Sequence, residues 1–167
     1  MEKNLERGEA LRKLKELAED IKFCMFATSD ANHYLYGRPM TTMQVEDNGT
    51  IWFFTSDRSK VAGDARGSEP VCLNYASPAK NNYLTVQGQV TLVKDKKKME
   101  ELWSPMLKAW FPDGLDSPDI ALLRVEPEQA HYWDADASRV EVLFAMIKGA
   151  VTGKPDDTGD HGELKIK

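Results

Sequence analysis

Five segments between residues 22 and 94 are rich in β-branched and aromatic residues, a pattern that requires a fold built around a sheet. These segments are 23–29, 35–45, 50–55, 70–76 and 83–93, and two further strands are predicted at 120–125 and 129–133. Turn signals separate them, and Asp47-Asn48-Gly49 predicts a hairpin between the second and third strands. Strands joined mainly by hairpins indicate a mainly antiparallel β barrel with α additions, of the α+β class, rather than a parallel sheet.

Short helices are predicted around this sheet. Apolar residues recur at helical spacing over residues 4–21, which predicts an amphipathic helix, and further helices are predicted within 56–67, 95–110 and 141–149. Residues 151–167 contain few apolar side chains and are expected to form a flexible tail. The chain is therefore divided into one domain over residues 1–150, with helices at both ends, and a tail over 151–167.

Length and charge narrow the classes of partner. A chain of 167 residues with 22 Lys and Arg against 27 Asp and Glu is one acidic domain, so the broad cationic surface of a nucleic-acid-binding protein is not expected. No apolar run approaches 18 residues, which predicts a cytoplasmic protein without a membrane span. The spacing of Cys24, Cys72 and the three histidines predicts neither a disulfide nor a metal site.

Residues 36–60 contain the side chains with the clearest chemistry. The period of two along a strand places Arg38, Met40 and Thr42 on one face, with Pro39 and Thr41 on the other. Because proline cannot donate a hydrogen bond to a neighbouring strand, Pro39 predicts a sheet edge or a bulge.

Hydroxyl groups and cations meet where the third strand leads into a short helix. Thr55, Ser56 and Ser59 lie at this junction, with Lys60 next in sequence and Arg38 on a nearby strand. Hydroxyls, two cations and free N–H groups at a helix start would suit a phosphate. Alternatively, Ser56 or Asp57 only caps the helix while the two cations are solvated. The spacing leaves both interpretations open.

These motifs resemble those of a known family. An Arg-Pro-Met strand at 38–40, the strand end Phe54-Thr55-Ser56 and a Ser59-Lys60 pair opening a helix are similar to the FMN-binding split barrels related to pyridoxamine-phosphate oxidase. The amphipathic helix leading into the strand at 23–28 resembles the bacterial general stress protein branch in particular. The resemblance covers about residues 5–135 and implies a split β-barrel with short flanking helices.

The resemblance also implies a cofactor and a partner: a homodimer that holds two FMN molecules at its interface, with FAD as the alternative flavin. Arg38, Ser59 and Lys60 match phosphate-binding positions, Met40 and Thr41 would lie along the ribityl chain and ring, and Trp133 would come from the partner subunit. The cofactor-binding residues implied are Arg38, Pro39, Met40, Thr41, Phe54, Thr55, Ser56, Ser59, Lys60, Gln87 and Trp133.

Three departures from the family pattern argue against pyridoxamine-phosphate oxidation. Val61 stands where a second basic residue is usual, Met43 stands near the expected place of a ring lysine, and Ser138-Arg139-Val140 does not provide the substrate-gripping Arg/His segment. The expected function is a flavin-dependent oxidoreductase acting on an unknown small molecule, or alternatively a stress protein that binds flavin without turnover. A haem or deazaflavin ligand is a third possibility by kinship. No catalytic residue is assigned.

An aromatic cluster, Trp103, Trp110 and Phe111, has two interpretations. These side chains could pack over one end of the barrel or against a second subunit, because aromatic residues provide much of the buried area in cores and interfaces. Alternatively, Trp110 or Phe111 forms a wall of the flavin pocket, reached across the dimer.

Overall fold

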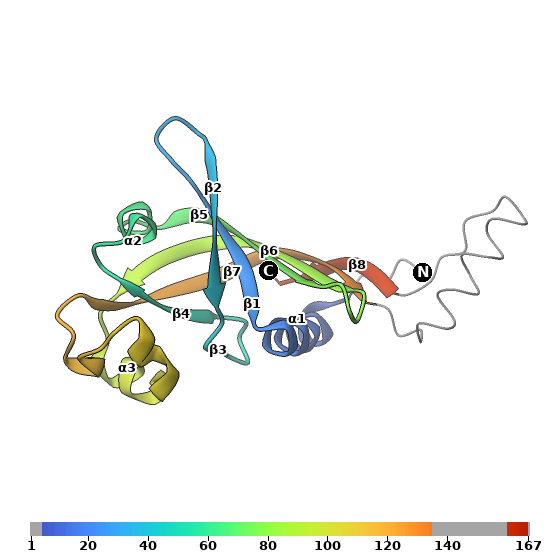
Figure 1. The fold of residues 1–167 in the computed structure, drawn as a ribbon. Helices are drawn as coiled ribbons and strands as arrows, with labels where there is room; N and C mark the ends of the chain where they lie inside the picture. Colours follow the sequence, from blue (N-terminus) through green and yellow to red (C-terminus); the bar gives the residue numbers. More distant parts are fainter. Residues whose placement is uncertain (1–4, 135–159, 167) are drawn as a thin grey trace, which may run out of the picture.

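An eight-stranded antiparallel sheet, curled into an open half-barrel, organises the chain (Figure 1). The computed structural model describes residues 5–134 and 160–166. The strand order is β2-β1-β5-β6-β7-β4-β3, and β8 pairs with the far half of β7. The strands are β1 (Phe23–Ser29), β2 (Leu35–Thr41), β3 (Gln44–Val45), β4 (Ile51–Ser56), β5 (Glu69–Ser77), β6 (Asn82–Val93), β7 (Ile120–Asp134) and β8 (Asp160–Lys165). The mainly antiparallel split-barrel class predicted from the sequence is confirmed.

The helices lie at the connections between strands. They are α1 (Arg7–Ile21), α2 (Lys60–Asp64) and α3 (Lys96–Leu102), followed by two 3₁₀ turns, η1 (Pro105–Ala109) and η2 (Gly114–Asp116). The prediction of one helix over 95–110 is wrong in its second half. A residue before proline disfavours the helical conformation, and Ser104 before Pro105 is extended, so α3 ends and η1 begins separately.

The predicted second strand is divided in two. β2 ends at Thr41 and β3 begins at Gln44, and the Asp47-Asn48-Gly49 turn joins β3 to β4. Gly49 has a φ of +95°, a conformation that glycine adopts without steric cost. β2 is an edge strand of the sheet, as Pro39 predicted, and β3 is at the other end of the strand order.

Two clusters of buried side chains lie on opposite faces of β4, which is why this strand is an unbroken apolar run. Ile51 and Phe53 belong to the main core, where the rings of Phe53 and Phe26 pack edge to face at 5.1 Å. Trp52 and Phe54 belong to a second cluster, formed with α3 and η1. The second cluster therefore fixes η1 against the sheet, and η1 forms part of the site described below.

β7 is one long strand rather than the two predicted on either side of 126–128. The register shifts between Gln87 and Gly88 of β6, where Gly88 pairs with Pro127. The shift accommodates a proline that cannot donate to the ladder. A Cβ at position 88 would lie 2.2 Å from the Glu126 carbonyl oxygen, so only glycine allows this approach.

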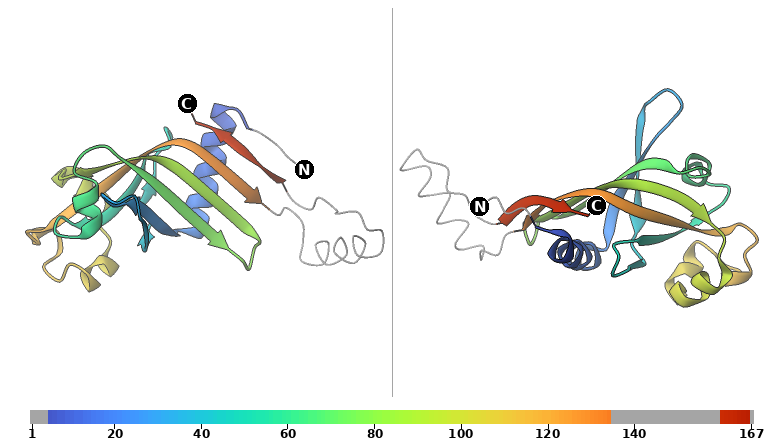
Figure 2. Two further views of the ribbon diagram at one scale, coloured as in Figure 1. Left: turned by 90° about the horizontal axis from the view of Figure 1, so that it is seen from above. Right: turned by 180° about the vertical axis from the view of Figure 1, so that it is seen from behind.

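Residues 160–165 are part of the sheet and Ile166 is buried, so the flexible tail predicted over 151–167 is wrong for residues 160–166. β8 lies beside β7 and close to the start of α1 (Figure 2). Leu164 is fully buried, and the Leu5 N–H donates to the Glu163 carbonyl at 3.1 Å. The rest of the predicted tail and the predicted helix at 141–149 lie outside the described residues. Among the helices the structure describes, none is long and apolar enough to cross a membrane.

Candidate functional site

A cavity of about 640 Å³ opens beside the edge strand β2, between the end of β4, the start of α2 and the η1 segment. Nine of the eleven residues predicted for the cofactor site line this cavity: Arg38, Pro39, Met40, Thr41, Phe54, Thr55, Ser56, Ser59 and Lys60. They come from two segments of sequence that the fold brings together, β2 and the β4–α2 junction. The predicted grouping is therefore present within one chain.

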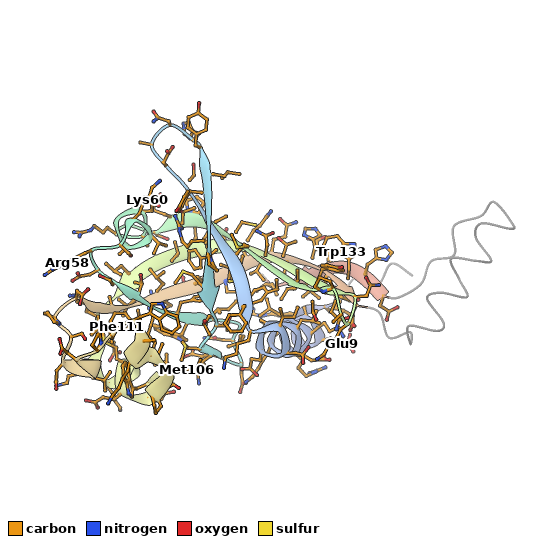
Figure 3. The ribbon with its side chains drawn as sticks, viewed as in Figure 1. Glu9, Arg58, Lys60, Met106, Phe111 and Trp133 are labelled. Carbon is orange, nitrogen blue, oxygen red and sulfur yellow. The ribbon has the colours of Figure 1, made fainter. Side chains whose placement is uncertain are left out.

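The other two predicted residues do not reach this cavity. Gln87 is exposed on β6, between its pairing partners Cys72 and Gln129. Trp133 is near the far end of β7, at the opposite end of the sheet from Lys60 (Figure 3). Its expected role was to reach a flavin of the partner subunit, and this stays a prediction.

Arg38 is the most tightly held cation of the cavity. Its Nη1 donates to the Thr28 hydroxyl at 2.9 Å, and that hydroxyl donates to the Asp64 carboxylate at 2.8 Å. The Nη2 atom is buried, lies 3.8 Å from Asp64 and has no hydrogen-bond partner among the described residues. Burial lowers the pKa of Arg38, mainly by desolvation, yet a guanidinium stays protonated in proteins. The cavity wall thus contains a charged group with an unused donor.

Lys60 supplies the second positive charge. Its ammonium nitrogen lies 4.7 Å from the centroid of the Tyr36 ring, and the Arg38 guanidinium carbon lies 4.6 Å from the same ring. No carboxylate among the described residues forms an ion pair with Lys60. Among the described residues, Asp64 is the one carboxylate that lies within 4 Å of either cation, which leaves this end of the cavity suited to an anion.

The hydroxyls at the β4–α2 junction have distinct roles. Ser59 caps α2 by accepting a hydrogen bond from the Ala62 N–H at 3.2 Å, and it lies 2.9 Å from the Thr55 hydroxyl. Ser56 instead donates to Asp119 at 2.6 Å, so neither Ser56 nor Asp57 is the cap. Because α2 has only five residues, the attraction for an anion depends on the side chains.

The cavity also has an apolar wall. It is formed by Met40, Met43, Phe54, Leu107, Trp110 and Phe111. Phe111 is buried against Phe54, with ring centroids 6.4 Å apart, whereas Trp110 is 68% exposed. The aromatic segment therefore packs over one end of the sheet, as the first interpretation predicts. Trp110 and Phe111 also line the cavity within the same chain, and a flavin contact across a dimer stays a prediction.

Several cavity residues are absent from the predicted set, among them Phe23, Met43 and Leu107, and Tyr36 is the one that contacts both cations. It lies in the segment singled out for its chemistry, two positions before Arg38 and on the same face of β2. Its role depends on Lys60, which is 24 residues away in sequence and close only in the folded chain. The period of two along β2 predicts that Tyr36 lies near Arg38, but it does not predict the contact between Tyr36 and Lys60.

The half-barrel with a cavity between a cationic end and an aromatic wall defines a split-barrel protein with a ligand pocket at the sheet edge. The chain belongs to the pyridoxamine 5'-phosphate oxidase like family, whose model matches residues 9–157. It is 28% identical over 144 residues to protein bli-3 of Neurospora crassa, a match that covers 80% of this chain and 69% of that protein.

Solved structures share the fold. A protein from Jannaschia sp. CCS1, provisionally named general stress protein 26, superposes with a TM-score of 0.77 at 23% identity, over 94% of this chain and 98% of the other. A general stress FMN/FAD binding protein from Xanthomonas citri superposes with a TM-score of 0.66 at 28% identity, over 77% of this chain and 90% of the other. This chain is thus similar to general stress proteins of the family.

Proposed function

We propose that this chain binds FMN in the cavity, with the phosphate between Arg38 and Lys60 and the ring along the apolar wall. The observation that carries the proposal is the buried Nη2 of Arg38, which has no hydrogen-bond partner among the described residues. A buried donor without a partner costs about 1–3 kcal/mol, and more when it is charged. A phosphate oxygen would supply the missing acceptor.

The size and walls of the cavity also suit a flavin. Its volume of about 640 Å³ lies in the usual range for a small-molecule site. Aromatic and thioether side chains such as Phe54, Trp110 and Met43 provide the apolar surface that a planar ring would contact. The Xanthomonas citri relative is described as binding FMN or FAD, which supports the choice of ligand.

A titration with three flavins tests the proposal. Riboflavin has the ring and ribityl chain but no phosphate, so we expect it to bind at least about tenfold more weakly than FMN, because a hydrogen bond to a charged group contributes about 1.5–3 kcal/mol. FAD, whose phosphate is esterified, shows whether the cationic end accepts a longer ligand. Isothermal titration calorimetry of ligand-free protein gives all three affinities. Equal affinities for FMN and riboflavin would contradict the phosphate site.

FMN supplies hydride and single-electron chemistry when it is bound, whereas the protein positions it and controls access. Arg38 and Lys60 would anchor one end, and the second cluster would hold Phe54 and Phe111 rigidly at the other.

We infer an oxidoreductase acting on a small molecule, with a flavin carrier as the alternative. Mixing FMN-loaded protein with a reduced nicotinamide separates the two: bleaching of the flavin absorbance, reversed by an added acceptor, identifies an enzyme, and no change with any donor favours a carrier.

We also propose a homodimer with the flavin at the interface. The outer face of the sheet carries large apolar side chains that are exposed in one chain, including Phe23, Met25 and Trp133. Such an exposed patch is typical of an interaction surface. Phe23 also lines the cavity, so a subunit covering this face would border the ligand. Sedimentation equilibrium should give twice the chain mass of 18.8 kDa, and a monomer at micromolar concentration would contradict the proposal.

A further inference from the structure

We propose that Tyr36 is a positioning residue for the anion site, because its ring holds the Arg38 and Lys60 cations together beside the cavity. This inference rests on the proposed binding of FMN through its phosphate. It assigns a role to a residue that is not among the predicted cofactor-binding residues.

The ring of Tyr36 contacts both cations at similar distance. The Arg38 guanidinium carbon is 4.6 Å from the ring centroid and the Lys60 ammonium nitrogen is 4.7 Å from it. Both distances are within the range in which the electron-rich ring attracts a cation. Tyr36 itself lines the cavity. One aromatic side chain therefore stabilises two like charges that would otherwise repel each other.

Contacts other than the Tyr36 ring restrain Arg38 more than they restrain Lys60. Arg38 is already fixed on its other side by the Thr28 hydroxyl, which Asp64 in turn orients, and Thr28 is the residue paired with Tyr36 across β1 and β2. Lys60 is exposed and has no carboxylate partner among residues 5–134 and 160–166. A free lysine side chain populates many rotamers, and ordering it lowers the free energy gained on binding. The Tyr36 ring therefore matters most for Lys60.

Three substitutions test this role, with FMN and riboflavin as the two probes. Tyr36→Leu removes the ring, Tyr36→Phe keeps it without the hydroxyl, and Tyr34→Leu is the matched control. Tyr34 is an exposed tyrosine near the start of β2 that does not line the cavity. All three variants should have thermal midpoints near that of the unmodified protein, since both tyrosines are exposed.

We expect Tyr36→Leu to weaken FMN binding about fivefold to thirtyfold, which corresponds to the loss of two cation–π contacts. Riboflavin binding should change less than about twofold, because it lacks the phosphate that the cations would hold. Tyr36→Phe should keep the affinity for FMN, since the ring and not the hydroxyl contacts the cations. Tyr34→Leu should change neither affinity.

The outcomes distinguish this inference from the proposed function. If the unmodified protein binds FMN and riboflavin equally, the phosphate site itself is wrong. If it prefers FMN and Tyr36→Leu keeps the same preference, Tyr36 does not position the cations. An equal loss of both ligands in Tyr36→Leu would assign Tyr36 a structural role only, and a loss in Tyr36→Phe as large as in Tyr36→Leu would assign the effect to the hydroxyl; either result overturns the inference.

Discussion

Replacing Arg38 and Lys60 together by alanine will weaken FMN binding at least a hundredfold and leave riboflavin binding nearly unchanged. Both side chains line the cavity. Each charge-assisted hydrogen bond to phosphate contributes about 1.5–3 kcal/mol, so losing two removes at least about 3 kcal/mol of binding free energy, or more than about a hundredfold in affinity. Calorimetry with FMN and with riboflavin measures both effects.

The single variants should differ in size. Arg38→Ala also leaves the Asp64 carboxylate, which lies 3.8 Å from the guanidinium, without its cation. That uncompensated charge would repel a phosphate, so Arg38→Ala should weaken FMN binding more than Lys60→Ala does. Lys60 is exposed, and screening by solvent reduces its contribution. Equal losses of FMN affinity in the two variants would contradict the prediction that the buried Arg38 contributes more than the exposed Lys60.

Arg58→Ala is the matched control for this pair. Arg58 carries the same charge and precedes Lys60 by two residues, but it is exposed, does not line the cavity and points away from the body of the molecule (Figure 3). Its removal should change FMN affinity less than about twofold, the scale of an exposed charge effect. A loss in Arg58→Ala comparable to that in the double variant would show that net charge, and not the cavity, governs binding.

The parts of the site that are formed by residues close together in the sequence could be predicted. Alternation along β2 placed Arg38 and Met40 on one face, and the helix start after β4 placed Ser59 beside Lys60. Part of the apolar wall, Leu107 and Phe111, comes from a segment about 50 residues after β4. Only the packing of the second cluster brings Phe111 to Phe54. No spacing rule in one sequence describes that contact.

The same reasoning explains the errors in the fold. The turn-like segment at 126–128 suggested a break, but Gly88 on the neighbouring strand lets β7 continue past Pro127. β8 contains one fully buried apolar residue, Leu164, which is too weak a periodic signal to predict a strand. Its stability comes from pairing with β7 and from contact with Leu5 near the start of the described chain.

Leu164→Ala should lower the free energy of unfolding by about 2–5 kcal/mol, the usual cost of truncating a fully buried leucine. Leu164 belongs to the main core and pairs with Ala130 of β7. Urea denaturation followed by circular dichroism measures the change. The size of the effect tests whether residues 160–166 unfold together with the rest of the sheet.

Lys165→Ala is the control, because Lys165 is the next residue on β8 and its exposed ion pair with Glu6 contributes less than about 1 kcal/mol. A loss below about 0.5 kcal/mol in Leu164→Ala would mean that β8 detaches before the sheet unfolds. β8 lies at the opposite end of the sheet from α2 (Figure 1), so FMN affinity should survive Leu164→Ala at temperatures where the variant is folded. The effect of Leu164→Ala on stability and the effects of the cavity variants on binding therefore arise at separate ends of the half-barrel, and the two sets of variants should be additive when combined.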